Sequence, residues 1–235
     1  MQKNKISILS TGDLSPAISG LIQENGVLLD AIAFTRINAL TDATEKIIGL
    51  ADKKLDVVFT SGNAVSAVTK MLRSKIPDWS VYTIAGNTWR AAEEYFGKKS
   101  IMAIADDASS LADVIVGKKI PQVIFFCGNL RRDELPSKLR EEGILVEEYK
   151  VYETMLTPQL LTRSYDGILF FSPGAVESFF SVNTLTTATK LFAIGNTTAK
   201  AIKTFSDQEV IVASRADKDL LIREAIQYFE SKAIK

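Results

Sequence analysis

The chain has 235 residues, enough for one large or two small domains, and 46% of them are hydrophobic, as in ordinary globular proteins. Its 28 basic and 28 acidic residues cancel and form no basic block, which argues against nucleic acid as a partner. The lack of histidine and the single cysteine exclude a histidine-based catalytic dyad, a multi-cysteine metal centre and an internal disulfide.

No apolar run reaches the roughly 18 residues that a membrane-spanning helix needs. The N-terminal residues enter a strand-like run directly and lack the apolar core and cleavage site of a signal peptide. A single cysteine fits a reducing compartment. We therefore expect a cytoplasmic protein that has no membrane partner.

Short apolar strands alternate with helices along the whole chain. We expect strands at 6–9, 27–29, 55–59, 81–84, 101–105, 123–126, 144–146, 167–171, 191–194 and 210–213. We expect helices after Asp13 (ending at 24–26), at 43–50, 64–72, 89–96, 111–116 (capped by Ser109), after Asn129, and at 175–180, 199–205 and 220–229 (capped by Asp217 or Asp219). This alternation predicts an α/β fold of two similar domains, each a parallel five-stranded sheet with helices on both faces.

An internal repeat supports two copies of one unit. The segment FTSGNAV (59–65) resembles FFSPGAV (170–176), and AGNT (85–88) resembles IGNT (194–197). The strand end at 10–12 resembles that at 126–128, and each precedes an expected helix. Because the matches fall at strand ends and in the same order, we interpret them as a duplication rather than as the general likeness of all α/β repeats.

The repeat leaves two ways to divide the chain. One is a simple cut near residue 118. The other places the crossings between the two domains at two extended runs. Each run continues as extended chain at a point where the strand–helix alternation would require a helix. We favour the second division: one domain at 1–33 plus 156–235, the other at 38–149, and a two-stranded interdomain linker at 34–37 and 150–155.

Six strand ends carry Gly, Ser, Thr or Asn before a helix: 10–13, 60–63, 86–88, 127–129, 172–174 and 195–198. In a parallel sheet these ends share the carboxyl edge, where helix N-termini offer backbone N–H groups to anions. N-capping explains any single corner, so the interpretation rests on all six together. They predict a cleft for a ligand with several separated negative charges. No corner matches a phosphate-binding or dinucleotide-binding loop.

Several side chains near these corners are ambiguous. Cys127 is either a nucleophile at a helix start or a small buried hydrophobe, and the lack of histidine favours the second. Arg131 and Arg132 either clamp a carboxylate or are solvated surface charges. Tyr152 is the best candidate for an acid, and packing between domains is its alternative role.

A family resemblance rests on FTSGNAV (59–65), AGNT (85–88), FFCGNLRRDELPSKLREEG (125–143), VYET (151–154), FFSPGAVESFF (170–180) and IGNTTAKAI (194–202). At these residues the chain resembles uroporphyrinogen-III synthases, the cosynthetases of tetrapyrrole and heme biosynthesis. The resemblance implies two α/β domains on a two-stranded linker, the first built from both chain ends. It also implies a cofactor-independent lyase, a monomer in our expectation. That enzyme closes hydroxymethylbilane, which has eight carboxylates, to uroporphyrinogen III with inversion of ring D and loss of water.

The resemblance further implies which residues form the site. The catalytic acid falls on Tyr152. The substrate-binding residues, which act mainly through backbone N–H groups, fall on Thr60, Ser61, Asn63, Gly86, Asn87, Thr88, Cys127, Gly128, Asn129, Ser172, Gly174, Ala175, Gly195, Asn196, Thr197 and Thr198. Gly174 departs from the family, where a residue with a side chain is common. No metal or organic cofactor is implied.

A rival interpretation from another class is a non-catalytic two-domain receptor that uses the same corners to bind a small multi-carboxylate anion. Receptors of that type usually act outside the cytoplasm, so the expected location favours the enzyme.

Overall fold

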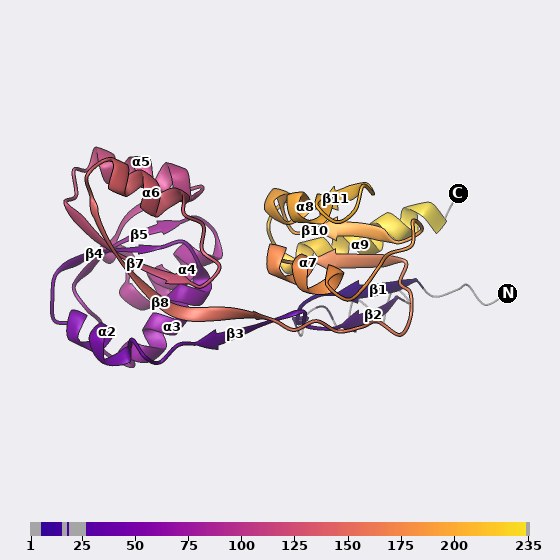
Figure 1. Cartoon of the computed structure of the whole chain (residues 1–235), viewed down its shortest axis with the longest axis horizontal. Helices are drawn as coiled ribbons and strands as arrows, with labels where there is room; N and C mark the ends of the chain where they lie inside the picture. Colours follow the sequence, from indigo (N-terminus) through magenta and orange to yellow (C-terminus); the bar gives the residue numbers. More distant parts are fainter. Residues whose placement is uncertain (1–5, 16–17, 19–26, 234–235) are drawn as a thin grey trace. The chain divides into compact units, whose positions relative to one another are not determined.

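The computed structural model describes residues 6–15, 18 and 27–233. The chain divides into two compact units, which can be followed by colour in Figure 1. Unit 1 contains Met1–Arg36 and Met155–Lys235, and unit 2 contains Ile37–Thr154. The middle of the chain thus forms one unit, and its two ends form the other. Within the described ranges, no helix is both long enough and apolar enough to cross a membrane.

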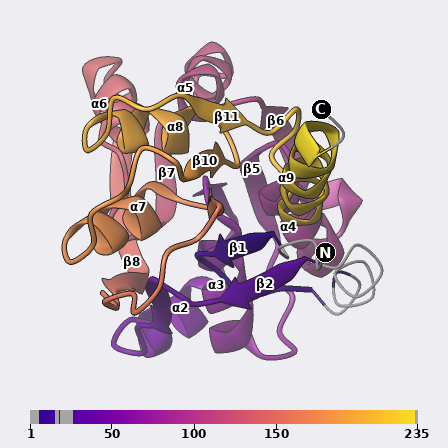
Figure 2. The same ribbon diagram turned by 90° about the vertical axis from the view of Figure 1, so that its right-hand side faces the viewer.

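Unit 1 contains a parallel sheet of five strands in the order β11–β10–β9–β1–β2, of which Figure 2 labels all but β9. The strands are β1 (Ser7–Ser10), β2 (Leu28–Ala31), β9 (Gly167–Phe170), β10 (Lys190–Ala193) and β11 (Val210–Val212). Helices α7 (Pro173–Phe180) and α8 (Asn196–Lys203) cover one face of this sheet, and α9 (Lys218–Ala233) covers the other. Apolar side chains on both faces are buried, which explains the near-continuous apolar strands.

Unit 2 contains a sheet of six strands in the order β3–β8–β7–β4–β5–β6. Its strands are β3 (Thr35–Ala39), β4 (Leu55–Phe59), β5 (Trp79–Ile84), β6 (Ile101–Ala105), β7 (Gln122–Gly128) and β8 (Leu145–Leu156). One face is covered by α2 (Thr44–Leu50), α3 (Gly62–Leu72) and α4 (Asn87–Phe96). The other face is covered by α5 (Ala108–Gly117) and α6 (Glu134–Glu141), and a short 3-10 turn (Lys98–Ser100) precedes β6.

The α/β fold with two similar halves is confirmed. Five strands of unit 2 are parallel in the order β8–β7–β4–β5–β6, which matches the order β2–β1–β9–β10–β11 of unit 1. In this correspondence, the repeated FTSGNAV and FFSPGAV segments follow β4 and β9, the equivalent central strands. The repeat seen in the sequence therefore describes two copies of one topology.

The prediction of five strands per sheet holds for unit 1 and is one strand short for unit 2. The sixth strand is β3, which we expected as a linker strand and which pairs with the end of β8. The backbone N–H of Leu40 donates to the carbonyl of Val151 at 3.0 Å, and that of Thr157 donates to Phe34 at 3.0 Å. Both chain segments that cross the boundary between the units therefore lie in this strand pair.

Two smaller predictions have clear outcomes. Asp217 caps α9, because its carboxylate accepts the N–H of Leu220 at 3.0 Å. Ser109 was the wrong cap for α5: the helix begins earlier, and Asp107 accepts the N–H of Ser110 at 2.8 Å. The helix expected after Asp13, with its stop at 24–26, lies mostly outside the described residues.

Candidate active site

Unit 2 has a cavity where its strand order reverses. From β4 the chain proceeds outward to β5 and β6, whereas β7 and β8 lie on the other side of β4. The carboxyl ends of β4 and β7 therefore flank a topological switch point, the usual ligand site of open α/β sheets. A cavity of about 320 Å³ lies here, lined by Thr60, Ser61, Ile84, Asp106, Asp107, Ala108, Phe125, Cys127, Gly128, Leu130, Arg131, Arg132, Leu135 and Tyr152.

A β-bulge directs Tyr152 into this cavity. Cys127 pairs with Lys150, but the next residue, Gly128, pairs with Tyr152, so Val151 is an extra residue on β8. Bulges bend a strand and re-aim its side chains. Here Val151 is fully buried in the core, whereas Tyr152 is half-buried and its hydroxyl donates to Ser61 Oγ at 3.0 Å.

The end of β7 is shaped to receive the Tyr152 ring. A Cβ atom on Gly128 would lie 2.4 Å from Tyr152 Cζ, so any side chain at this position would collide with the ring. The side chain of the next residue, Asn129, binds the backbone of the chain just after Tyr152. Its Nδ2 donates to the Thr154 carbonyl at 3.2 Å, and its Oδ1 accepts the Thr154 N–H at 2.8 Å. These contacts fix the chain on the C-terminal side of Tyr152.

Ser61 joins the tyrosine to a helix start. It is the N-cap of α3, and its Oγ accepts the N–H of Asn63 at 3.2 Å as well as the Tyr152 hydroxyl. In unit 1, Ser172 holds the equivalent position and accepts the N–H of Ala175 at 3.1 Å. The strand ends carrying these serines are thus helix N-termini, as the sequence predicted.

The two Gly-Asn-Thr corners are helix N-termini as well. Gly86 precedes α4 with φ +83°, a left-handed conformation that glycine adopts without strain, and Gly195 precedes α8 in an extended conformation. Neither residue has a side chain that could cap its helix. The first-turn N–H groups of any helix lack intrahelical acceptors, and in α4 and α8 no cap side chain accepts from them.

Some of the predicted site residues line the cavity in unit 2, and others do not. Its lining includes Thr60, Ser61, Cys127, Gly128 and Tyr152. Its lining does not include Asn63, Gly86, Asn87, Thr88 or Asn129. The remaining predicted residues lie in unit 1, around the starts of α7 and α8: Ser172, Gly174, Ala175, Gly195, Asn196, Thr197 and Thr198.

Burial limits what three of these residues can offer to a ligand. The side chains of Thr88, Ala175 and Thr198 are buried in the protein, each less than a tenth exposed. Thr88 and Thr198 can therefore contact a ligand through the backbone alone, and the backbone N–H of Ala175 is already bonded to Ser172. By contrast, Asn87, Asn196 and Thr197 are exposed.

The corner expected at Cys127–Asn129 is not a helix start. Cys127 and Gly128 belong to β7, and α6 begins only at Glu134, after a loop. The predicted helix start was too early, because the charged residues of this loop resemble the first turn of a helix in the sequence. The contribution of this strand end to the cavity is instead the open space above Gly128, which has no side chain.

The single cysteine is a buried small hydrophobe, the second of its two predicted roles. Cys127 is 2% exposed, and burial, followed by the negative charge of Glu148, raises the pKa of its thiol to about 11. The thiol therefore stays protonated near neutral pH, in contrast to the thiolate that a nucleophile requires.

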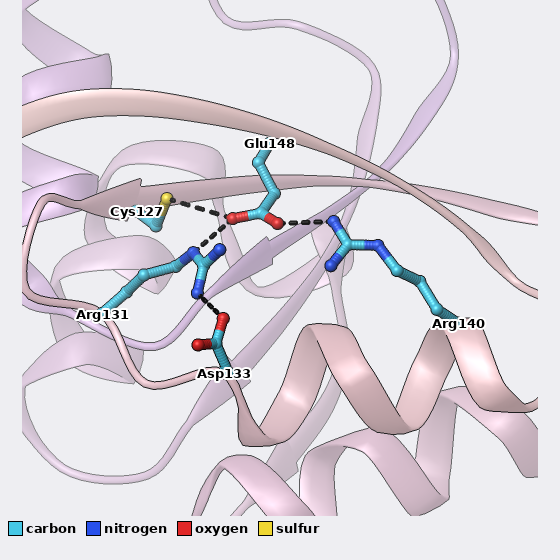
Figure 3. A network of polar contacts seen from close by, with 5 residues as sticks. All are labelled: Cys127, Arg131, Asp133, Arg140 and Glu148. Atoms are coloured by element: carbon cyan, nitrogen blue, oxygen red, sulfur yellow. Dashed lines mark hydrogen bonds and ion pairs between the residues drawn. The ribbon is translucent and has the colours of Figure 1, made fainter.

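An ion-pair network lies beside the cavity (Figure 3). Glu148, on β8, accepts hydrogen bonds from Arg131 Nε and from Arg140 Nη2, the latter at 2.5 Å. Arg131 also donates from Nη1 to Asp133. The Cys127 thiol lies 4.0 Å from the same Glu148 oxygen that receives Arg131. Arg131 is therefore both a cavity-lining residue and a tightly paired one.

Two acidic residues of the cavity were missed by the sequence analysis. Asp106 and Asp107 follow β6 directly and line the cavity. The hydrogen bond from Ser110 lowers the pKa of the Asp107 carboxyl. Their position after a predicted strand was the available signal, but they lack the Gly, Ser, Thr and Asn pattern of the other corners. The described residues contain no cluster of three or more His, Cys, Asp or Glu that could hold a metal ion.

Unit 1 has a further cavity of about 390 Å³, and it lies away from the predicted corners. Its lining includes Tyr165, two residues before β9, and Thr189, which immediately precedes β10. It is therefore at the amino edge of the sheet, whereas Ser172 and Gly195 are at the carboxyl edge.

Comparisons with solved structures agree with this fold. A mutant uroporphyrinogen III synthase from the extremely thermophilic bacterium Thermus thermophilus aligns with a TM-score of 0.70 and 16% identity, covering 96% of this chain and 99% of that one. Uroporphyrinogen-III synthetase from Helicobacter pylori aligns with a TM-score of 0.66 and 16% identity, covering 95% and 99%. At this level of identity, the likeness shows a shared fold.

The comparison with family models is more specific. The model of the family described as uroporphyrinogen-III synthase HemD matches residues 16–223, which is most of the chain and includes both units. This match shows that the chain belongs to the uroporphyrinogen-III synthase (HemD) family.

Proposed function

We propose that the protein is a lyase of tetrapyrrole biosynthesis that closes hydroxymethylbilane to uroporphyrinogen III. Membership of the HemD family supports this reaction. The observation that carries the proposal is the placement of Tyr152, whose hydroxyl enters the cavity at the switch point of unit 2 and is held by Ser61 at 3.0 Å. A positioned phenol can act as a proton donor for the leaving hydroxyl.

In the proposed mechanism, the Tyr152 hydroxyl gives its proton to the terminal hydroxyl of the bilane as the carbon–oxygen bond breaks. Water leaves, and the pyrrole nitrogen supplies electrons to form an azafulvene. Ring D then attacks through its substituted carbon, and rearrangement of the resulting spiro intermediate inverts that ring and forms the final bond at its free α-carbon. That carbon loses its proton as the pyrrole becomes aromatic again, which balances the proton given by Tyr152. The protein's main task is to hold the chain in this reactive geometry. The reaction involves no net oxidation or reduction, and we propose no metal or organic cofactor.

We propose that backbone N–H groups at the helix starts hold the substrate carboxylates. All four helix starts, α3, α4, α7 and α8, present the positive end of a helix dipole, which favours anions. No side chain caps α4 or α8, whereas in α3 and α7 the cap serine already binds one N–H group, that of Asn63 or Ala175. Because the chain has zero formal net charge, these local dipoles replace a general positive surface. The binding set remains the one expected from the resemblance, and the two units are proposed as the two domains, with 34–37 and 150–155 as linker.

The decisive test is the isomer formed. The purified protein is incubated with hydroxymethylbilane, the products are oxidised to porphyrins, and the isomers are separated by chromatography. We expect the type III isomer. If only the type I isomer appears, which the bilane forms without an enzyme, the proposed activity is wrong. Tight binding of a small polycarboxylate without turnover would then favour the receptor interpretation.

A further inference from the structure

Arg131 has two very different carboxylate partners. It lies in the loop between β7 and α6, lines the same cavity as Tyr152, and has a side chain that is 22% exposed. Hydrogen bonding and charge from Asp133 and Glu148 raise the pKa of its guanidinium, which therefore remains charged. The side chain of Glu148 is 16% exposed, whereas that of Asp133 is 79% exposed.

Glu148 is a fixed anchor for the arginine. It lies within the β8 strand, and its two oxygens are divided between Arg131 and Arg140 (Figure 3). A mostly buried carboxylate with two cationic partners is costly to separate from either of them. Arg131 is therefore held at its Nε, on the side away from Asp133.

Asp133 is an exchangeable partner. It occupies the N-cap position of α6, where an aspartate commonly caps its own helix, but its side chain makes no cap hydrogen bond. Its carboxylate instead accepts from Arg131 Nη1 in an exposed ion pair. Since water solvates the exposed Asp133 carboxylate, the pair contributes little stability. Because Asp133 makes no cap hydrogen bond, removing its charge leaves the helix cap unchanged.

We propose that Arg131 is a carboxylate-binding residue of the cavity, that Glu148 positions it, and that Asp133 occupies it until a substrate carboxylate takes its place. This inference rests on the proposed function, because it needs a polyanionic substrate. A guanidinium has five N–H groups, and Glu148 and Asp133 use one each. When a ligand carboxylate displaces Asp133, one anion replaces another at Arg131, and the hydrogen bond from Arg131 Nε to Glu148 is kept.

The proposal predicts opposite effects for the two partners of the arginine. Asp133→Asn removes the competing charge, and we expect KM for hydroxymethylbilane to fall about two- to fivefold with kcat unchanged. Arg131→Ala removes a charge-assisted hydrogen bond, and we expect KM to rise about ten- to a hundredfold. Glu148→Gln weakens the anchor, and we expect KM to rise because Arg131 is no longer held toward the cavity.

A matched control separates this effect from a general change in charge. Asp113, on α5, is 64% exposed and pairs with Lys138 at 2.7 Å, outside the cavity lining. Asp113→Asn removes the same charge from the same unit, and we expect no change in KM. In the double variant Asp133→Asn/Arg131→Ala, the gain should vanish, because the two residues act through one contact.

The same variants are also tested by binding, which needs no turnover. Uroporphyrin III carries eight carboxylates and coproporphyrin III carries four, and both are fluorescent. We expect Asp133→Asn to tighten uroporphyrin binding more than coproporphyrin binding, and Arg131→Ala to weaken uroporphyrin binding more. Equal effects of Asp133→Asn and Asp113→Asn, in both KM and uroporphyrin affinity, would overturn the proposal even in a protein that forms the type III isomer. Formation of the type I isomer alone would instead reject the proposed function, and the porphyrin affinities would still show whether Arg131 binds carboxylates.

Discussion

The ring of Tyr152 lies directly over Gly128, where an added Cβ would come within 2.4 Å of the ring carbon Cζ. The two residues are register partners across a bulge in adjacent strands, β7 and β8. Because Gly128 has no side chain, it leaves room for the phenol of Tyr152, the proposed proton donor. This relationship makes the position of the phenol directly testable.

Gly128→Ala should displace the Tyr152 ring. We expect kcat to fall at least about tenfold, because proton transfer depends on the position of the donor. We expect the melting temperature to fall as well, because the ring must move within a packed site. Gly117→Ala is the matched control: Gly117 lies in α5 with nothing within 4 Å of its Cβ position, so activity should not change. Steady-state kinetics and thermal melts check both variants, and full activity of Gly128→Ala would contradict the expectation.

Tyr152→Phe keeps the ring and removes only the hydroxyl. We expect kcat to fall by about ten- to a hundredfold or more, the usual contribution of a general acid, with KM close to that of the unmodified protein. The ring still packs over Gly128, so the thermal melt should hardly change. Unchanged kcat would show that Tyr152 serves for packing alone.

Ser61→Ala should affect both stability and catalysis. The hydroxyl caps α3 and accepts the Tyr152 hydroxyl, so its loss should lower the unfolding free energy by about 1 kcal/mol and also lower kcat. Asp217→Ala provides the control, since it removes the cap of α9 in unit 1 and should cost similar stability without loss of kcat. Ser61→Thr, which retains a hydroxyl, should restore most of the activity. Equal kcat values for Ser61→Ala and Asp217→Ala would separate Ser61 from catalysis.

The Cys127 thiol should make stability depend on pH in the alkaline range. Its pKa is raised from 9.0 to about 11 in the folded protein, so the unfolded chain loses this proton first as the pH rises. The stabilising effect is complete below pH 9 and is lost as the pH approaches 11. Urea unfolding at several pH values should show that the unmodified protein loses more stability across this range than Cys127→Ala does. Parallel pH profiles would mean that the thiol titrates normally.

Much of the fold could be predicted from the sequence. A strand that is buried on both faces is an apolar run, and the turns that follow such strands are rich in Gly, Ser, Thr or Asn. The sequence therefore showed both β4 and β9 and the serine that begins the helix after each of them. The strand β3 was recognised as an extended run, but its membership of the second sheet was not, since pairing at a sheet edge leaves little apolar pattern.

The local details of the site were less accessible. The contact of Tyr152 with Gly128 depends on a bulge, and a bulge depends on the register between two strands rather than on either strand alone. The Glu148 network likewise joins residues from β8, α6 and the preceding loop. Charged residues in a sequence look the same whether they are solvated or paired, so Arg131 could not be assigned to the cavity until its neighbours were known.

The division of the chain also has a consequence for its synthesis. Unit 2 is continuous, whereas unit 1 needs strands from both ends, with β1 between β2 and β9. A nascent chain emerging from the ribosome therefore contains β1 and β2 long before β9 exists to pair with them. Two strands alone are marginally stable in water, so we expect unit 2 to finish folding first. Until the last third of the chain is synthesised, the N-terminal strands remain unpaired with β9 and accessible to chaperones.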